Sequence, residues 1–453
     1  MRLSVLALLL ATTACTTLAV NACSSDPAAS TDPDASTDPD GSSTTNPETG
    51  TTDPDGASTD GSNPDGASNV DGSSGDGGGD ASDGATDAGI DAADAADAAD
   101  AADAANPGGP VEVQLVGRFT ATDGTGRSFA FPGSRLVARF TGATAVVTLS
   151  QTNGFSGGPS YFNVIIDDEP QAPIAVSGTS VDYTVAQNLA AGVEHKIEIE
   201  KRTEGNLGVV RYEGFKFPGG GALIGSLPRP TRRIEFLSES TIDGFGVEGD
   251  RNAGAANYCG AGMAPAQYNN VRKSTAALTA ASLSAEYFMI GYSGKGITKN
   301  ASAGDPLVFP TLYDRTLPDT AGNWDFASWV PDAVVVSLGG VDFNGQVTAP
   351  AGFNAAYGSL VDKVRVAYPQ AHIFLTVWSQ IKNDTIPTRT AMMGSLQAVI
   401  DARAGDTKLY TYAFVKADVN TDETGCQFHA NAAHHVAKSA ELVTFIKTKI
   451  AGW

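Results

Sequence analysis

Hydrophobic and polar residues alternate along the stretch from about residue 110 to residue 222. Seven segments rich in Val, Phe, Tyr and Thr place apolar side chains at every second position, and Gly, Asn and Asp separate them. These segments are RSFAFPG, RLVARFTG, TAVVTLSQ, YFNVIID, VDYTVAQ, HKIEIEK and VVRYEGFKF. A period of two is typical of half-buried strands, and short strands at regular spacing indicate an antiparallel β-sandwich. We therefore predict a β jelly roll over 110–222, followed by a Gly- and Pro-containing linker at 223–231.

The pattern changes at residue 232, where short, fully apolar runs begin to alternate with segments of helical period. The expected strands are IEFLS, EYFMIGYS, AVVVSLGG, HIFLTVWS and KLYTYAFV. The expected helices are QYNNVRKSTAALTAASL, FNAAYGSLVDKVRVAY and a last one that follows His429 and runs through KSAELVTFIKTKI. Strands that alternate with helices predict an α/β sandwich with a parallel sheet over 232–453. In such sheets ligands bind beyond the carboxyl ends of the strands, so we expect a site in the loops that follow them.

The first 22 residues have the pattern of a secretory signal. Arg2 precedes the apolar run LSVLALLLA, and small residues follow it. The sequence VNAC, which ends at Cys23, resembles a bacterial lipobox and predicts a lipid on Cys23. Cys15 is the rival lipidation site, and a cleaved signal without lipid is the alternative. We expect a lipid-anchored protein of the bacterial cell envelope, at the outer membrane or the cell surface.

Residues 23–109 are predicted to form a disordered tether. Repeats of TDPDG, SDG and DAA contain almost no large apolar side chain, so ordering them would bury too little surface to offset the entropy lost. A short Ala-rich helix at 90–105 remains an option. The tether's role is reach away from the membrane; metal binding by its acidic residues is the alternative.

Most of the net charge of −22 is located in the tether. Residues 24–109 contain 20 Asp and Glu and no Lys or Arg, whereas residues 110–453 contain 31 acidic against 28 basic residues. The folded part is therefore nearly neutral. Nucleic-acid binding requires clustered Lys and Arg, which argues against such a partner. We expect a monomer.

Four motifs follow the predicted strands or precede the last helix. Ser240 lies in SES, Gly294 in SGKG, Asp342 and Asn344 in GGVDFN, and His429 in GCQFHAN. A hydroxyl, a base and exposed backbone N–H groups are the parts of acyl-transfer chemistry. Each motif alone is weak, because a Ser after a strand is usually a helix cap and a Gly loop is usually a turn. Five histidines without HExxH or a Cys cluster predict no metal, and the chemistry needs no cofactor.

Taken together, these motifs resemble a known family. RRIEFLSESTIDGFG, YSGKGITKN, VVVSLGGVDF and GCQFHANAAHH resemble the motifs of SGNH (GDSL-type) hydrolases, and residues 111–453 resemble the two-domain carbohydrate esterase family 2. The resemblance implies a jelly roll on a flavodoxin-like, three-layer α/β sandwich. It also implies Ser240 as nucleophile, His429 as general base, and the Ser240 and Gly294 N–H groups as oxyanion donors. The implied reaction is deacetylation of hemicellulose sugars.

The oxyanion motif departs from the family pattern. The family's Gly-Asp-Ser is Ser238, Glu239 and Ser240 here, and the Asn that donates from its side chain is Val341. Loss of one such donor costs about 3 kcal/mol, or 10²–10³ in rate, in other hydrolases. We name Asn344, three residues later, as a candidate replacement.

The acid that usually accompanies the histidine is also missing. The family's two acidic positions are Cys426 and Gln427 here, so we expect a backbone carbonyl to hold the Nδ1–H of His429 and fix its tautomer. His434 and His435 are alternative bases, expected to face away from the strand edge.

Three further residue assignments complete the prediction. Cys259 and Cys426 lie in loops that the resemblance brings near one site, so we expect a disulfide in an exported chain; two separate thiols are the alternative. Asp342 and Trp378 are candidate substrate contacts, with loop hydrogen bonding and burial as the respective alternatives. Trp324 is a weaker candidate for stacking on a sugar.

The sequence thus predicts a serine esterase that removes O-acetyl groups from xylan- or mannan-type polysaccharide or oligosaccharide through an acetyl-enzyme. The alternative is a catalytically degenerate lipoprotein that binds carbohydrate at the cell surface, which the missing Asn and Asp favour.

Overall fold

The computed structural model describes residues 113–453, apart from 125, 155, 226, 250–258, 260–265, 380–384 and 417–423. The predicted signal peptide, Cys23 and the tether lie outside the described residues. None of the helices among the described residues has the length and apolar character needed to cross a membrane.

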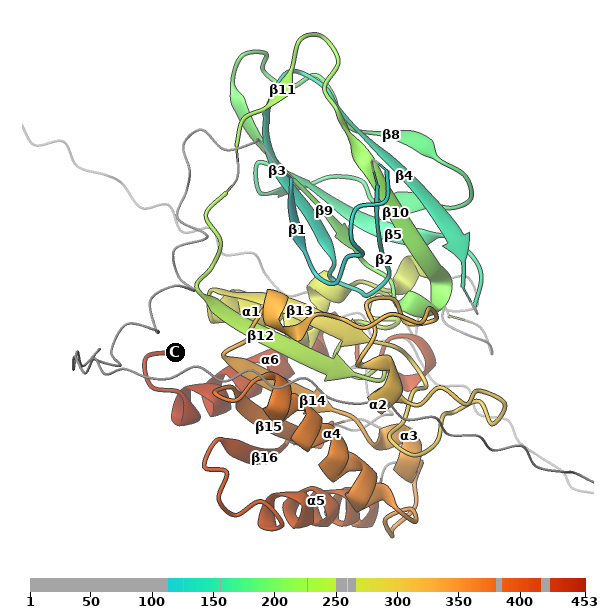
Figure 1. Cartoon of the computed structure of the whole chain (residues 1–453), viewed down its shortest axis with the longest axis vertical. Helices are drawn as coiled ribbons and strands as arrows, with labels where there is room; N and C mark the ends of the chain where they lie inside the picture. Colours follow the sequence, from blue (N-terminus) through green and yellow to red (C-terminus); the bar gives the residue numbers. More distant parts are fainter. Residues whose placement is uncertain are drawn as a thin grey trace, which may run out of the picture. The chain divides into compact units, whose positions relative to one another are not determined.

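Two antiparallel sheets form the β-sandwich that the alternating pattern predicts (Figure 1). The seven-stranded sheet contains β1 (Gln114–Val116), β3 (Arg135–Thr141), β9 (Glu194–Lys201), β5 (Ser160–Ile166) and β6 (Glu169–Pro170), with β11 (Ala222–Leu223) on β3 and β7 (Ile174–Val176) on β5. The four-stranded sheet contains β2 (Arg127–Phe129), β10 (Gly208–Lys216), β4 (Ala145–Asn153) and β8 (Val181–Ala186). Alternate residues such as Phe140, Phe162 and Val210 fill the space between them.

The third sheet belongs to the α/β domain. It has five strands, is parallel throughout and has the order β13-β12-β14-β15-β16. Its strands are β12 (Arg232–Ser238), β13 (Ala285–Gly291), β14 (Ala333–Ser337), β15 (His372–Val377) and β16 (Leu409–Ala413). In chain order this is 2-1-3-4-5, the flavodoxin-like arrangement. The direction of winding reverses between β12 and β14, and such a switch point opens a crevice at the carboxyl ends of these two strands.

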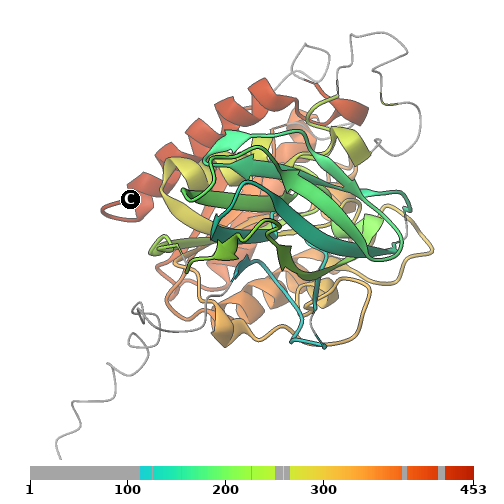
Figure 2. The ribbon, with the colours of Figure 1, turned by 90° about the horizontal axis from the view of Figure 1, so that it is seen from above.

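Helices cover both faces of this sheet (Figures 1 and 2). Helices α1 (Thr275–Ser282) and α6 (Ala432–Lys449) pack on Ile234, Phe236 and their neighbours. Helices α4 (Phe353–Ala367) and α5 (Ile386–Asp401) pack on the opposite face, against Leu237, Val334 and others. Because both faces are buried, the strands are continuously apolar rather than alternating. The predicted three-layer sandwich is confirmed.

Two helices differ from the sequence expectation. The first begins at Thr275 rather than at residue 267, because Asn270 and Ser274 have extended backbones and cap a short 3₁₀ turn, η3 (Val271–Lys273), and α1 respectively. Helix α5 was not expected at all. The remaining short helical turns are α2 (Phe309–Leu312), α3 (Gly340–Phe343), η1 (Gly205–Leu207), η2 (Ala266–Tyr268), η4 (Phe326–Ser328) and η5 (Cys426–Phe428).

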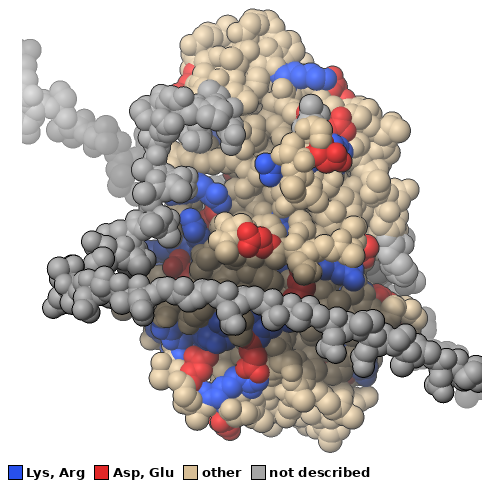
Figure 3. Space-filling model, in the orientation of Figure 1, with Lys and Arg blue, Asp and Glu red and all other residues tan. Residues whose placement is uncertain are grey.

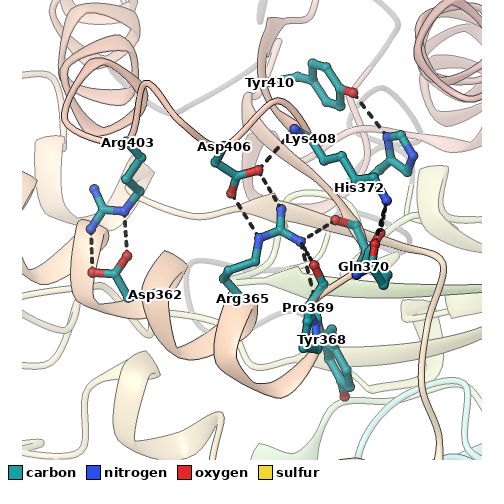
Figure 4. Close-up of polar contacts among 11 residues, drawn as sticks. Asp362, Arg365, Tyr368, Pro369, Gln370, His372, Arg403, Asp406, Lys408 and Tyr410 are labelled. Carbon is teal, nitrogen blue, oxygen red and sulfur yellow. Dashed lines mark hydrogen bonds and ion pairs between the residues drawn. The ribbon is translucent and has the colours of Figure 1, made fainter. Parts of the chain in front are cut away.

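A polar network closes the amino end of β15 and β16 (Figure 4). Arg365 of α4 pairs with Asp406 at 2.9 Å, and Arg403 pairs with Asp362 of α4 at 2.6 Å. These contacts tie α4 to the turn that follows α5. They lie at the end of the sheet opposite to the switch point and have a structural role.

The sandwich and the α/β domain are joined by buried polar contacts. Arg118 donates to Glu235 of β12 at 3.0 Å and to the carbonyl of Tyr313 at 2.5 Å, and the Tyr313 hydroxyl donates to the other Glu235 oxygen at 2.8 Å. A second junction joins Arg272 of η3 to Glu198 and Glu200 of β9. Both charged side chains of the first junction are fully buried. The pairing satisfies charges that would be costly to bury alone.

Charges of both signs are interspersed on the described part of the surface in Figure 3. This agrees with the near-neutral balance of residues 110–453.

Candidate active site

Ser240 lies two residues beyond the end of β12, at the switch point of the sheet. The Ser238 hydroxyl accepts the N–H groups of Thr241 and Ile242 at 3.2 and 3.3 Å, and so folds the chain sharply after the strand. Thr241 is held in turn by Ser337 of β14, with 3.1 Å between their hydroxyl oxygens. The turn leaves the Ser240 side chain half-buried. Ser238 therefore supports the turn although the family motif has Gly there.

His429 contacts Ser240 across 189 positions of sequence. Its Nε2 lies 2.9 Å from the Ser240 Oγ, and its Nδ1 lies 3.1 Å from the carbonyl oxygen of Gln427. A carbonyl can only accept, so Nδ1 carries the proton and the Nε2 lone pair faces the hydroxyl. This is the arrangement a general base requires. The structure therefore places together the two residues on which the predicted chemistry depends.

The turn before His429 is bent so that this carbonyl points back at the ring. Gln427 and Phe428 both have positive φ, 51° and 63°, which is uncommon for residues other than Gly. The His429 N–H donates to the Cys426 carbonyl at 2.9 Å and closes the turn η5. Cys426 forms a disulfide with Cys259. The cross-link thus anchors the turn that orients the imidazole.

Glycines make room for this anchor. A Cβ on Gly249 would lie 2.3 Å from the Cys426 Sγ, and one on Gly246 would lie 2.5 Å from the Cys426 Cβ. Real atoms do not approach so closely, so the chain beyond the Ser240 turn must lack side chains at these positions.

Burial lowers the pKa of His429 to about 4, and the carbonyls of Gln427 and Cys426 counter that effect only in part. The Phe245 ring, 4.6 Å from the imidazole between centroids, contributes to its apolar surroundings. Among the described residues no carboxylate contributes to this pKa shift. The imidazole is therefore neutral, and able to accept a proton, over the whole physiological range.

The loop after β13 carries Gly294, one predicted oxyanion donor. Its φ of +78° suits Gly, and its carbonyl accepts the Ala301 N–H at 2.8 Å. The preceding residue is held through its N–H and hydroxyl by Glu204 of the β-sandwich, at 3.0 and 2.6 Å. The donor roles of the Ser240 and Gly294 N–H groups stay predictions.

Glu239 supports the loop after β14, a function that motif comparison missed. Its carboxyl is buried and accepts the Val341 N–H at 3.1 Å, together with the N–H groups of Gly339 and Gly340. Burial raises the pKa of Glu239 to about 8 despite these donors. The only available signal was its place beside Ser240. Asn344, at the end of α3, is exposed with a φ of 42°; its role as an oxyanion donor stays a prediction.

Two predicted substrate contacts are wrong. Asp342 is fully buried, and its oxygens accept the N–H groups of Ile297 and Thr298, both at 2.7 Å, so it joins two loops. Trp378 is 2% exposed and packs on Phe414. Neither side chain is available to a sugar.

The alternative bases have structural partners. The His434 Nε2 lies 2.6 Å from the Ser379 hydroxyl, and the His435 Nδ1 accepts the Thr275 N–H at 3.0 Å. Within the described residues, no group of three or more His, Cys, Asp or Glu is arranged to hold a metal ion.

A flavodoxin-like sheet with a Ser–His pair at its switch point is the arrangement typical of carboxylic ester hydrolases of the SGNH type. Comparison with known proteins specifies the family. Residues 115–226 match the family model "Carbohydrate esterase 2 N-terminal". A family two carbohydrate esterase from Clostridium thermocellum, solved in complex with cellohexaose, is 32% identical with a TM-score of 0.67, over 75% of this chain and 99% of that one.

Curated relatives agree. Cellulase/esterase CelE of Acetivibrio thermocellus is 34% identical over 340 residues, which are 74% of this chain and 39% of that protein. The chain therefore spans about two fifths of the length of that relative. An acetylxylan esterase / glucomannan deacetylase of Cellvibrio japonicus is 27% identical over 75% of this chain and 89% of its own length. The chain belongs to carbohydrate esterase family 2.

Proposed function

We propose that the chain is an active serine esterase that removes O-acetyl groups from xylan- or mannan-type polysaccharide or oligosaccharide. The observation that carries this proposal is the 2.9 Å contact between Ser240 Oγ and His429 Nε2, with Nδ1 held by a backbone carbonyl. The acetylxylan esterase / glucomannan deacetylase relative supports the substrate class, and the cellohexaose complex of another relative supports a carbohydrate ligand.

The reaction proceeds in two halves. Ser240 Oγ attacks the acetyl carbonyl carbon while His429 Nε2 takes the hydroxyl proton. The tetrahedral oxyanion faces the Ser240 and Gly294 N–H groups. The bond from the acetyl carbon to the sugar oxygen then breaks, and His429 returns the proton to that oxygen. Water attacks the acetyl-enzyme with His429 again as base, which yields acetate and free Ser240.

Two features predict a slow enzyme. An imidazole with a pKa of about 4 has less driving force for proton removal than one near 7. Val341 offers no side-chain donor, and its N–H is engaged by Glu239. These features also favour the second candidate function, a degenerate lipoprotein that binds carbohydrate at the cell surface.

Acetate release separates the two functions. Wild type and Ser240→Ala are assayed on acetylated xylan, acetylated glucomannan, acetylated chitin and 4-nitrophenyl acetate. The esterase proposal predicts release by the wild type that the mutation reduces by about 10³ or more. Equal inertness of the two proteins, with retained binding to the polysaccharide, supports the second candidate instead.

We also propose that the protein is a monomer held at the bacterial cell envelope by a lipid on Cys23. The lipobox-like VNAC motif supports the lipid. Mass spectrometry of the mature N-terminal peptide tests it, since an unmodified terminus at any residue contradicts the anchor.

A further inference from the structure

A carboxyl from the β-sandwich reaches into the catalytic domain beside the Gly294 loop. Glu204 lies three residues beyond β9 and is 1% exposed. Its Oε2 accepts the Ser293 N–H at 3.0 Å, and its Oε1 accepts the Ser293 hydroxyl at 2.6 Å. Both hydrogen-bond donors of Ser293 are thus held by one side chain from the other domain.

The segment that carries Glu204 is itself fixed. The fully buried Lys201 Nζ donates to the carbonyls of Thr203 and Glu204 at 2.7 and 2.9 Å, and to the Thr203 hydroxyl at 3.0 Å. The Lys201 amino group thus fastens the turn through three acceptors of that same turn. Glu204 therefore extends from a turn that buried hydrogen bonds hold together.

Glu204 also contacts the turn that carries the nucleophile. Its carboxyl hydrogen-bonds with that of Asp243, three residues after Ser240, and both are buried. Two carboxylates repel, so this contact requires a shared proton. Among the described residues no other donor occupies the buried Asp243 Oδ2, so this oxygen is available for the shared proton. Burial and the neighbouring Asp243 raise the pKa of Glu204 well above its usual range.

The two peptides that flank the Ser293–Gly294 peptide are consequently both held by hydrogen bonds. Glu204 holds the Ser293 side of this peptide, and the Ala301 N–H holds the Gly294 carbonyl at 2.8 Å. The Gly294 N–H lies between these anchors. Glu204 thus holds the residue before Gly294 and also contacts the turn that carries Ser240.

We propose that Glu204 is a positioning residue for the ester-hydrolysing site: the β-sandwich uses this carboxyl, hydrogen-bonded to Asp243, to set the Gly294 N–H against Ser240. This inference rests on the proposed function, because it assigns the Gly294 N–H to the oxyanion. It gives the β-sandwich a part in catalysis besides any part in carbohydrate binding.

Three substitutions at residue 204 test the proposal. Glu204→Asp keeps a carboxyl but is one methylene too short to reach Ser293, and Glu204→Ala removes the carboxyl. Glu204→Gln keeps an acceptor for the Ser293 N–H and offers Asp243 an N–H in place of the shared proton. Displaced catalytic groups cost up to about 10² in rate, so we expect the Asp and Ala variants to lose about 10- to 100-fold in kcat with KM changed less than about threefold. Glu204→Gln should stay within about threefold of the wild type.

The matched control is Arg272→Met, which breaks the other junction between the domains without contacting the Ser293 loop. It should lower Tm and leave kcat within about twofold. A merely structural Glu204 would instead give variants whose Tm falls while kcat of the folded fraction stays that of the wild type, and this result overturns the proposal. So does a Glu204→Gln variant as slow as Glu204→Ala.

Amide hydrogen exchange at Ser293, whose N–H is bonded to Glu204, gives a test that does not depend on turnover. Protection should fall at least tenfold in Glu204→Asp and remain in Glu204→Gln. If the wild type and Ser240→Ala are equally inert, the proposed function fails separately, and exchange alone decides whether Glu204 holds the loop. Unchanged protection in Glu204→Asp then refutes the inference.

Discussion

Lowering the pH should inactivate the enzyme only near pH 4, far below the usual range for a histidine base. The base is active when its imidazole is neutral, and kcat/KM reports the pKa of the free enzyme. With a pKa of about 4, about 90% of His429 is neutral at pH 5, whereas an unperturbed ring with a pKa of about 6.5 would be about 3% neutral. The predicted difference in kcat/KM at pH 5 is therefore about 30-fold.

The cause of this shift is loss of water around the ring without a compensating carboxylate. The same shift links pH to stability. Between pH 6.5 and 4 the unfolded chain binds a proton that folded His429 does not, so stability falls as the pH falls through this window. Over the full window the loss is up to about 3 kcal/mol, which unfolding measurements must separate from the loss of activity.

The assay is initial acetate release between pH 3.5 and 9, with tryptophan fluorescence at each pH to confirm that the protein is folded. An acid limb with its midpoint between about pH 3.5 and 5 in folded protein agrees with the structure. A midpoint near 6.5 would show that water or an acidic group reaches the imidazole, and the account of His429 given above would be wrong.

Three other changes have defined outcomes. Glu239→Gln should raise Tm relative to the wild type, and by more at pH 9 than at pH 5. The reason is that the raised pKa of Glu239, about 8, gives the wild type stability that is present below pH 4.5 and lost as the pH rises through 8. An equal difference in Tm at both pH values contradicts this. Val341→Asn should raise kcat by about tenfold by adding a side-chain donor, with Val341→Thr as control, and no gain means that residue 341 does not face the oxyanion. Cys259→Ser removes the disulfide that closes a loop of 167 residues, a cross-link whose chain-entropy contribution to stability is up to about 5 kcal/mol, and should lower both Tm and kcat. Dithiothreitol should lower Tm and kcat of the wild type in the same way and leave those of the variant unchanged.

The sequence predicted those parts that depend on local pattern. Period-two alternation predicted the sandwich, and continuous apolar runs predicted the parallel sheet. Helix α5 was missed because Gly394 and several Thr residues weaken its helical pattern, and packing on the sheet overrides these weak propensities. Its start was readable, since Thr385 is the N-cap and Pro387 lies in the first turn, where proline is tolerated.

The candidate site was predictable only as far as its motifs. Ser240 and His429 follow from motif order. The roles of Asp342 and Glu239 do not, since a carboxylate next to a motif looks the same whether it faces substrate or accepts N–H groups from another loop. Glu204 lies in the run IEIEKRTEGNLGVVRYEGF, which resembles the family's pattern, but its role had no signal because the loop it holds lies 89 positions away in a different domain.

The orienting partner of His429 belongs to the main chain, and this has a consequence for how such enzymes diverge. Any amino acid at position 427 supplies a carbonyl, so a change of side chain cannot delete the partner. What selection can act on is conformation, since φ there is positive and β-branched residues resist that geometry. We therefore expect substitutions tolerated at 427 to follow backbone preference, with Asn and Gly accepted and Val or Ile harmful, rather than acidity.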